Sequence, residues 1–514
     1  MLLPYAHAAF ELWGAVMDQT VIAAKIKDGD ARTVQDYIDE TPFWADGTNV
    51  PDGPMSGMQW RIWWLSIAGK FFEGLVVFMT GVALPLLAKD WDLSAAQHGM
   101  IGAATLFGIL IGASALGALS DYFGRKPMFI FEIGLFTLFL VLIVMSPGFI
   151  WFIVCLFGLG LALGCDYPTA HVMISESTPS RIRGRLVLGA FGFQAAGALA
   201  GTAVGYFALS LDPDVGAWRW MYGAAVVPAL LVLIGRFFVT ESPHWLAETG
   251  HRQEAEAELK RLLQRHPPYP PQFNVPPAKA EADARMESGY GALFKKKNRR
   301  ALVLASLPWF LQDLGTYGIG IFTPTILAAS LGHNREHAQN VADIVHNDLL
   351  AAKGAAMIDV LLLLGIAVAV LLSDKVGRIK LQVLGFLGCA AGLFIAAQSA
   401  LFSDNDPLKL VLIFAGFMLF NFMTNLGPNA QTYLIAGEVF PTKVRAKGAG
   451  LAAAFAKIGA CTTAFLFPIL LFDIGTQALL YILVGTSLLG ALVTWLFRIE
   501  TKGVKLDTVG VELE

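Results

Sequence analysis

The stretches DYFGRK at 121–126 and DKVGR at 374–378 carry the same Asp-x-x-Gly-Arg pattern, 253 residues apart. A second pair repeats with them, because ESTPSRIR at 176–183 and EVFPTKVR at 438–445 lie 262 residues apart with the same internal spacing. Two halves of the same construction are therefore predicted, an arrangement typical of secondary transporters with a central site.

The composition indicates an integral membrane protein. Of the 514 residues, 55% are hydrophobic and 15% are charged, and the mean hydropathy is +0.59, whereas soluble domains carry about 25% charged residues. A net charge of −3 gives no basic face for a nucleic acid. The four cysteines lie far apart in apolar runs, so we expect small buried side chains and neither disulfides, metal nor cofactor.

Twelve apolar runs are long enough to cross a bilayer, which takes roughly 20 residues. They are 62–88, 97–119, 127–146, 148–172, 186–209, 218–239, 301–329, 354–373, 379–402, 408–436, 448–472 and 476–498. Such long, uniformly apolar runs are helices rather than barrel strands. The predicted fold is an all-α integral membrane bundle of twelve transmembrane helices in two six-helix halves.

Lysine and arginine are concentrated in the loops 120–126, 180–185, 374–380 and 443–447. By the positive-inside rule these loops, and with them both termini, are expected in the cytoplasm. We expect five parts: a cytoplasmic extension at 1–60, a half at 61–240, a cytoplasmic linker with one amphipathic helix at 241–300, a half at 301–500 and a cytoplasmic tail at 501–514. In the extension, Leu2–Val34 is compatible with one or two amphipathic helices and Thr41–Pro54 with a loop.

In the Asp-x-x-Gly-Arg motif, glycine permits a tight turn and the two charges can pair with neighbouring helix ends. Such pairs would break and re-form during alternating access. An isolated motif would be read as a loop anchor at the headgroups, but its duplication favours gating. The expected gating residues are Asp121, Arg125, Glu176, Arg183, Asp374, Arg378, Glu438 and Arg445.

These motifs resemble a known family. GALSDYFGRK at 117–126 is similar to the loop signature of the major facilitator superfamily, and ESPHWL at 241–246 and ETKG at 500–503 resemble the endings of its sugar-porter members. The resemblance covers about residues 60–505 and leaves the N-terminal extension outside. It implies a transporter rather than an enzyme, but the superfamily carries many substrates.

Charged and polar side chains at membrane depth are costly, so each is a functional candidate. Trp309, Asp313 and Tyr317 form one stripe at four-residue spacing, and Asn421, Asn425 and Asn429 form another across a Gly-Pro pair that should open the helix locally. Each of these residues also has a structural alternative. Glu73 could form a structural pair with Lys70, the asparagines could make interhelical contacts, and Trp309 could be an interfacial residue.

A narrower resemblance is to the phosphate:proton symporter branch. It rests on WFLQDLGTYG at 309–318, DYP at 166–168, NLGPN at 425–429 and KIGA at 457–460; the Gln-Gln pair and Gly-Asn element of usual sugar porters are absent from the seventh span. The first span departs from that branch, because Glu73 stands alone where two Asp are expected and Lys70 adds a cation.

The resemblance implies an anion-binding set, to which we add Asn425 from the asparagine stripe, and a proton-coupling pair. The binding set is Tyr167, Gln194, Trp309, Asp313, Tyr317, Asn425, Asn429 and Lys457, and the coupling pair is Glu73 and Asp166. A lysine with several neutral donors suits an oxygen-rich anion, and a carboxylate beside them selects one that still carries hydroxyl groups.

We therefore expect a proton-coupled symporter that imports a small hydroxylated anion, inorganic phosphate first, across the inner or plasma membrane as a monomer. The alternative is a proton symporter for a sugar, sugar acid or other organic anion. A transporter-like sensor is disfavoured because neither extension nor linker contains a recognisable output domain. An enzyme or ATP-driven pump is disfavoured because no phosphate-cradling glycine motif or metal-ligand cluster is present.

Overall fold

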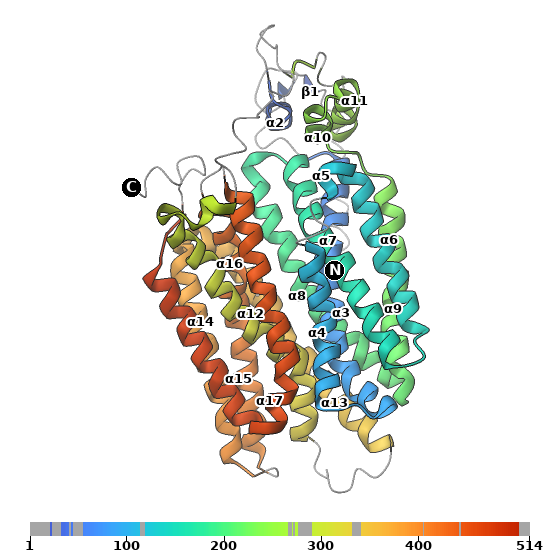
Figure 1. Cartoon of the computed structure of the whole chain (residues 1–514), viewed down its shortest axis with the longest axis vertical. Coiled ribbons are helices and arrows are strands. Elements are labelled where there is room, and N and C mark those ends of the chain that lie inside the picture. The colour runs from blue at the N-terminus through green and yellow to red at the C-terminus, as the bar shows by residue number, and fades with distance from the viewer. Residues whose placement is uncertain are drawn as a thin grey trace, which may run out of the picture.

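The computed structural model describes residues 21–22, 32–40, 43–44, 55–113, 119–265, 270, 273–275, 290–331, 341–403, 406–440 and 444–502. Long helices dominate, and Figure 1 shows the blue-to-green helices of the first half beside the yellow-to-red helices of the second. The first half comprises α3 (Gly57–Trp91), α4 (Ala95–Ile111), α5 (Leu119–Phe123), α6 (Arg125–Val144), α7 (Phe149–Ser177), α8 (Ser180–Leu211) and α9 (Trp218–Phe237).

The second half comprises α12 (Lys296–Leu331), α13 (Val341–Val376), α14 (Arg378–Ala397), α15 (Pro407–Leu426), α16 (Pro428–Glu438) and α17 (Arg445–Leu496). Short 3₁₀ turns occur at Val215–Ala217, Tyr290–Phe294 and Gln398–Leu401. Nine segments of the described chain are long and apolar enough to span a membrane. With α4, α12 and the division of α17 at Gly475, whose φ is 77°, they give the twelve predicted spans.

The tenth predicted span is interrupted where its Gly-Pro pair lies. Helix α15 ends at Leu426 and α16 begins at Pro428, with Gly427 at φ −110° and ψ −101°. Proline lacks the amide hydrogen that would continue the helix, and glycine accepts the unusual conformation. A Cβ on Gly427 would also lie 2.5 Å from the Gly385 Cα of α14, so the break is pressed against a neighbouring helix.

The linker folds into two short helices, α10 (Pro243–Glu248) and α11 (Arg252–Leu263), at one end of the bundle (Figure 1). The amphipathic face of α11 buries Ala255, Leu259, Leu262 and Leu263. We call this end the linker face and the opposite end the far face. The described parts of the Asp-x-x-Gly-Arg turns also lie at the linker face.

The N-terminal extension departs from expectation. Val21–Ile22 forms strand β1, antiparallel to β2 at Phe43–Trp44, where a helix and a loop were predicted. Both residues of β1 are β-branched, which favours extended backbone. Most of the predicted helical region 2–34 lies outside the described residues.

Helix α2 (Val34–Asp39) ties the extension to the first half. Its Tyr37 is almost fully buried in a cluster with side chains of α3, α10 and α11. The Asp39 carboxylate accepts hydrogen bonds from the backbone N–H and the hydroxyl of Ser180, both at 2.7 Å. Asp39 therefore caps the N-terminus of α8, a position where carboxylates are stabilising.

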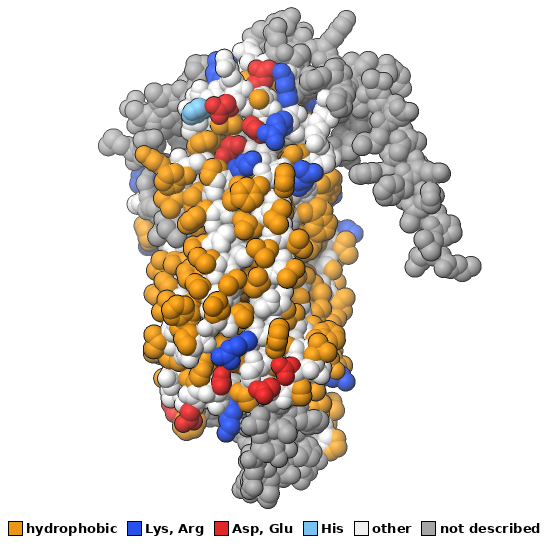
Figure 2. Space-filling view, turned by 90° about the vertical axis from the view of Figure 1, so that its right-hand side faces the viewer, with side chains coloured by type: hydrophobic (Ala, Val, Ile, Leu, Met, Phe, Trp, Pro, Cys, Tyr) orange, Lys and Arg blue, Asp and Glu red, His pale blue; other side chains and the backbone are white. Residues whose placement is uncertain are grey.

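The sides of the bundle are apolar on the outside as well as inside. Figure 2 shows orange side chains covering the flank between two charged ends. Phe131, Val154, Phe207 and Leu231 are all more than half exposed. Large exposed apolar side chains around the whole flank are those of a protein solvated by lipid.

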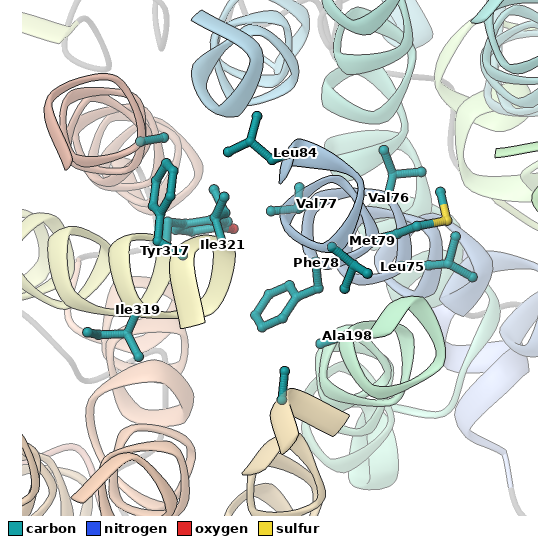
Figure 3. Close-up of a cluster of buried hydrophobic side chains, with 14 of the residues drawn as sticks. Leu75, Val76, Val77, Phe78, Met79, Leu84, Ala198, Tyr317, Ile319 and Ile321 are labelled. Atoms are coloured by element: carbon teal, nitrogen blue, oxygen red, sulfur yellow. The ribbon is translucent and has the colours of Figure 1, made fainter. Parts of the chain in front are cut away.

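The two halves meet along α3 with α12, α4 with α17, and α8 with α13. Figure 3 shows Val77 and Phe78 of α3 on the side toward α12, with Ile321 of α12 on the side toward α3. Toward the far face the contacts are backbone-close: a Cβ on Gly81 would lie 2.2 Å from the Ile321 carbonyl oxygen, and one on Gly99 would lie 2.3 Å from the Phe465 carbonyl oxygen. Helix backbones thus close the far side of the central region.

Candidate substrate and proton site

A buried cluster at the middle of the bundle joins side chains from both halves. Lys457 of α17 donates to the Tyr317 hydroxyl of α12 at 2.5 Å and lies 3.2 Å from Glu73 Oε1 of α3. Tyr317 in turn donates to the same Glu73 oxygen at 2.8 Å, and Gln194 Nε2 of α8 donates to the Tyr317 oxygen at 3.0 Å. Four predicted site residues therefore share one hydrogen-bond network.

Lys70, predicted as an extra cation and as an alternative structural partner of Glu73, belongs to the same cluster. Its ammonium lies 2.5 Å from Glu73 Oε2, so the structural i, i+3 pair is present. The same ammonium lies 3.5 Å from the centre of the Tyr167 ring, a cation–π contact. Glu73 is thus held by two lysines, one from each half.

Asp313 faces Lys457 from one turn before Tyr317. Its Oδ2 lies 3.7 Å from Lys457 Nζ, and the residue is buried. Trp309, one turn earlier on the predicted stripe, is buried in the second half and meets Tyr433 edge-on with ring centroids 6.1 Å apart. Within this stripe, Asp313 and Tyr317 therefore lie beside Lys457, whereas Trp309 contacts Tyr433 instead.

The asparagine stripe runs along the interrupted tenth span. Asn429 donates to Asn425 Oδ1 at 2.6 Å, and Asn425 donates to the Leu362 carbonyl of α13 at 2.9 Å. Asn421 donates to Asp359 at 3.1 Å, which is the predicted interhelical contact. Asn425 and Asn429 border a cavity, whereas Asn421 lies outside it.

Two cavities flank the cluster and share Phe191 as a wall. The first is bordered by Lys70, Glu73, Asp166, Tyr167 and Tyr433, among others. The second is bordered by Gln194, Tyr317, Asn425 and Asn429 together with apolar residues of α3, α8 and α13. Of the predicted binding residues, Tyr167 borders the first cavity and Gln194, Tyr317, Asn425 and Asn429 border the second. Trp309, Asp313 and Lys457 border neither cavity.

Asp166, expected to work with Glu73 in proton coupling, borders the first cavity but has its own partner. Its Oδ1 lies 2.6 Å from Arg236 Nη2 of α9. Arg236 is completely buried, and the sequence analysis did not single it out. It lies near the end of the predicted sixth span, where an arginine usually marks the membrane interface.

Tyr433 of α16 borders the first cavity from the second half. Its ring stacks on Phe191 of α8 at 4.5 Å, and its hydroxyl lies 2.9 Å from His171 Nδ1 of α7. Tyr167 meets it edge-on at 6.5 Å. One side chain from the second half therefore sits among three from the first, a placement that no motif in the sequence had indicated.

The duplicated motifs form two matching charge clusters at the linker face. In the first half, Arg125 Nη2 lies 3.2 Å from Glu176 and Nη1 donates to the Ser120 carbonyl at 3.0 Å. Glu241 accepts from the backbone N–H groups of Arg125 and Lys126 at 3.1 Å. Gly124 has a φ of 99°, and a Cβ there would lie 2.6 Å from the Glu241 carboxylate.

The second half repeats this cluster. Arg378 Nε lies 3.1 Å from Glu438, its Nη1 donates to the Ser373 carbonyl, and its backbone N–H donates to Glu500 at 3.0 Å. Gly377 has a φ of 105°. The conformation of both glycines explains why the turns require that residue. Arg125–Glu176 and Arg378–Glu438 each join residues of one half.

Of the remaining predicted gating residues, only some have side chains within the described part of the structure. Arg183 donates to the Ser180 hydroxyl at 3.4 Å, next to the α2 contact. The side chains of Asp121, Asp374 and Arg445 lie outside the described part of the structure.

Ion pairs outside these clusters stay at the surface of the linker or near the far face, such as Lys260–Glu256 and Arg219–Asp90. No group of three or more histidine, cysteine or acidic side chains within the described residues is placed to hold a metal ion.

Comparison with known proteins agrees with this architecture. Residues 61–513 match the model of the family described as sugar (and other) transporter. The chain is 30% identical over 467 residues to the inner membrane metabolite transport protein YgcS of Escherichia coli strain K12, covering 90% of this chain and 96% of that protein. It is 31% identical over 431 residues to the repressible high-affinity phosphate permease of Neurospora crassa, covering 76% of this chain and 72% of that protein.

Among solved structures, the inward open conformation of the xylose transporter XylE from E. coli superposes with a TM-score of 0.70 at 21% identity, covering 89% of this chain and 100% of that one. This likeness confirms the predicted twelve-helix fold. The family and its solved neighbours are transporters rather than enzymes. The protein is a multi-pass membrane protein of the major facilitator superfamily, resembling its phosphate branch, and belongs to the sugar (and other) transporter family.

Proposed function

We propose that the protein is a proton-coupled symporter that imports a small hydroxylated anion, with inorganic phosphate as the first candidate. The observation that carries the proposal is Lys457, which lies between the carboxylates of Glu73 and Asp313 and donates to Tyr317. An anion that enters this site must take Lys457 away from Glu73.

The charges of the cluster couple the binding of a proton to the binding of an anion. With Lys70, Lys457, Glu73 and Asp313 all ionised, the cluster is neutral and offers an anion no net attraction. A proton on Glu73 leaves one positive charge in excess and weakens the hold of Glu73 on both lysines. Because the proton then favours the anion, the anion must favour the proton by the same free energy.

Asp313 selects among anions. A carboxylate accepts hydrogen bonds and donates none, so it repels an ionised oxygen but binds a hydroxyl group. Dihydrogen phosphate carries hydroxyl groups, and sulfate near neutral pH does not. The phosphate permease of Neurospora crassa among the relatives supports phosphate as the first substrate to test.

A sugar acid or other hydroxylated organic anion is the second candidate, and Lys70 is the observation that favours it. The Lys70 ammonium over the Tyr167 ring adds a second cation to a cavity that extends away from Lys457. A carboxylate at one lysine with hydroxyl groups at Asp313 and Asn429 would use both cavities. A neutral sugar would bring no negative charge to balance the excess cation that remains once Glu73 is protonated, which is costly in a buried site.

Transport would proceed by rocking of the two halves around this site. We place the linker face and both termini in the cytoplasm on the charge of the loops, with the far face outside the inner or plasma membrane. Opening toward the cytoplasm would withdraw Tyr433 from α7 and α8. Opening outward would separate α3 from α12, and the Arg125 and Arg378 clusters would keep each half rigid while their surroundings change.

Uptake of radiolabelled phosphate into proteoliposomes, with and without an inward proton gradient, tests the proposal. We expect gradient-driven accumulation that a protonophore abolishes, and a loss of about tenfold to a hundredfold in phosphate affinity for Asp313→Asn, the usual range for a hydrogen bond to a charged group. Asp36→Asn, on the exposed side of α2, is the matched control. Absence of phosphate uptake together with uptake of gluconate would transfer the assignment to organic anions.

A further inference from the structure

A second charged cluster lies behind the site, entirely within the first half. Arg236 of α9 lies 2.6 Å from Asp166 of α7 and 3.9 Å from Glu132 of α6. Its Nη1 donates to the Phe129 carbonyl at 2.6 Å and its Nη2 to the Leu65 carbonyl at 3.2 Å. One guanidinium thus fastens α3, α6, α7 and α9 together and faces two carboxyl groups.

The cluster has one positive and two potentially negative groups. Glu132 and Arg236 have no exposed side-chain surface, and Asp166 has 8%. With both carboxyl groups ionised the cluster would hold an uncompensated negative charge away from water, which is costly. A single proton on either carboxyl group makes the cluster neutral.

The hydrogen bonds leave room for that proton. Glu132 Oε1 accepts from the Thr169 hydroxyl at 2.6 Å, while no donor reaches Oε2 within the described residues. An ionised carboxylate oxygen buried without a donor is unfavourable, whereas a protonated one is satisfied more easily. Two carboxyl groups that share one cation in this way bind a proton as a pair.

The pair is connected to the charged cavity. Asp166 borders it with Lys70 and Glu73, and a Cβ on Gly69 would lie 1.6 Å from Asp166 Oδ2, so the carboxylate rests on the α3 backbone beside Lys70. The titratable groups around the pair are Lys70 and Glu73 from α3, Cys165 and Tyr167 from α7, and Arg236 from α9. Asp166, but not Glu132, therefore borders the charged cavity.

We propose that Glu132 is a proton-carrying residue that shares one transported proton with Asp166 over Arg236. The proton enters from the cavity onto Asp166 or Glu132, is held while the site is loaded, and returns to water when the opposite face opens. Asp166 then regains its full ion pair with Arg236. This inference rests on the proposed proton coupling and adds a residue and a proton to it.

The test measures the proton-to-substrate ratio of Glu132→Gln in proteoliposomes, from the accumulation reached at a set pH gradient, for whichever anion the wild type transports. Glutamine keeps the shape and removes the proton, so the ratio should fall by one while exchange of substrate without a gradient continues. Thr169→Val is the matched control, because it disturbs the same hydrogen bond and leaves both carboxyl groups; its ratio should equal that of the wild type.

Infrared absorption of protonated carboxyl groups gives a second readout that needs no substrate. We expect Glu132→Gln and Asp166→Asn each to remove the same pH-dependent band, since both act on one shared proton. If Glu132→Gln does not fold, Glu132→Asp replaces it and should keep both ratio and band. If wild-type uptake is driven by protons and Glu132→Gln has an unchanged proton-to-substrate ratio, this inference alone is overturned. If wild-type uptake does not depend on the proton gradient, the proposed coupling is overturned.

Discussion

Lys457 Nζ and Glu73 Oε1 lie 3.2 Å apart and join helices of opposite halves, α17 and α3. Glu73→Gln removes the negative charge that competes with an anion for Lys457. We expect anion binding to persist and to depend less on pH than in the wild type, while accumulation driven by a proton gradient is lost. Binding by calorimetry at several pH values, beside gradient-driven uptake, checks this. Binding that stays pH-dependent with full accumulation would contradict it.

The ring of Tyr433 is expected to limit access to the first cavity from the linker face. Tyr433→Ala removes the ring that stacks on Phe191, so a cysteine introduced at the cavity-lining Ala170 should react faster with a polar maleimide. Tyr433→Phe keeps the ring, loses only the contact with His171, and should react nearly as slowly as the parent. Equal rates for all three proteins would show that Tyr433 does not close the cavity.

The far face should not tolerate a methyl group on α3. A Cβ on Gly81 would lie 2.2 Å from the Ile321 carbonyl oxygen, so Gly81→Ala must push α3 and α12 apart. The expected loss is about 1–3 kcal/mol of unfolding free energy, the usual cost of overpacking, seen as a lower Tm in detergent. Gly485→Ala, with open space around the new Cβ, is the control and should leave Tm unchanged.

The extension should stabilise the first half through Asp39. Removing a helix cap costs about 1 kcal/mol, so Asp39→Ala should lower Tm, and Asp39→Asn, which still caps Ser180, should recover most of the loss. Tm values equal to that of the wild type for both variants would mean that the contact between α2 and α8 contributes nothing to stability.

The turn at Gly124 gives a pH prediction. Burial raises the pKa of Glu241, although backbone N–H groups of Ser242, Lys126 and Arg125 oppose the shift. A raised carboxyl pKa contributes stability that is complete below the unfolded value and is lost as the pH rises through the folded value. The Tm advantage of the wild type over Glu241→Gln should therefore shrink as the pH rises from about 4 to 8. An advantage that grows with pH would contradict the sign.

Much of the fold was predictable because membrane helices are decided locally. Twenty apolar residues in a row are a span wherever they occur, and the breaks at Gly427 and Gly475 lie where glycine and proline predict them. The extension was predicted less well, since strand pairing of Val21–Ile22 with Phe43–Trp44 depends on a distant partner rather than on local pattern.

The site, like the fold, has features that the sequence predicts and features that it does not. Spacing along one helix placed Asp313 and Tyr317 on a common face, and both do reach Lys457. Spacing does not tell which helices touch, so it gave neither the Lys70–Tyr167 contact nor Tyr433 between α7 and α8. Arg236 was not predicted as a site residue because an arginine near the end of a span is ordinary, and only the fold shows that it faces Asp166.

The two sides of the central region differ in the size of the parts that meet there. On the linker side the ring of Tyr433 stacks on Phe191, whereas on the far side whole helices meet at Gly81 and Gly99. Side-chain rotations occur in picoseconds to nanoseconds when unhindered, and collective motions of helices take microseconds to milliseconds. The far side can therefore open only by a collective motion of helices, on the slower of these two timescales.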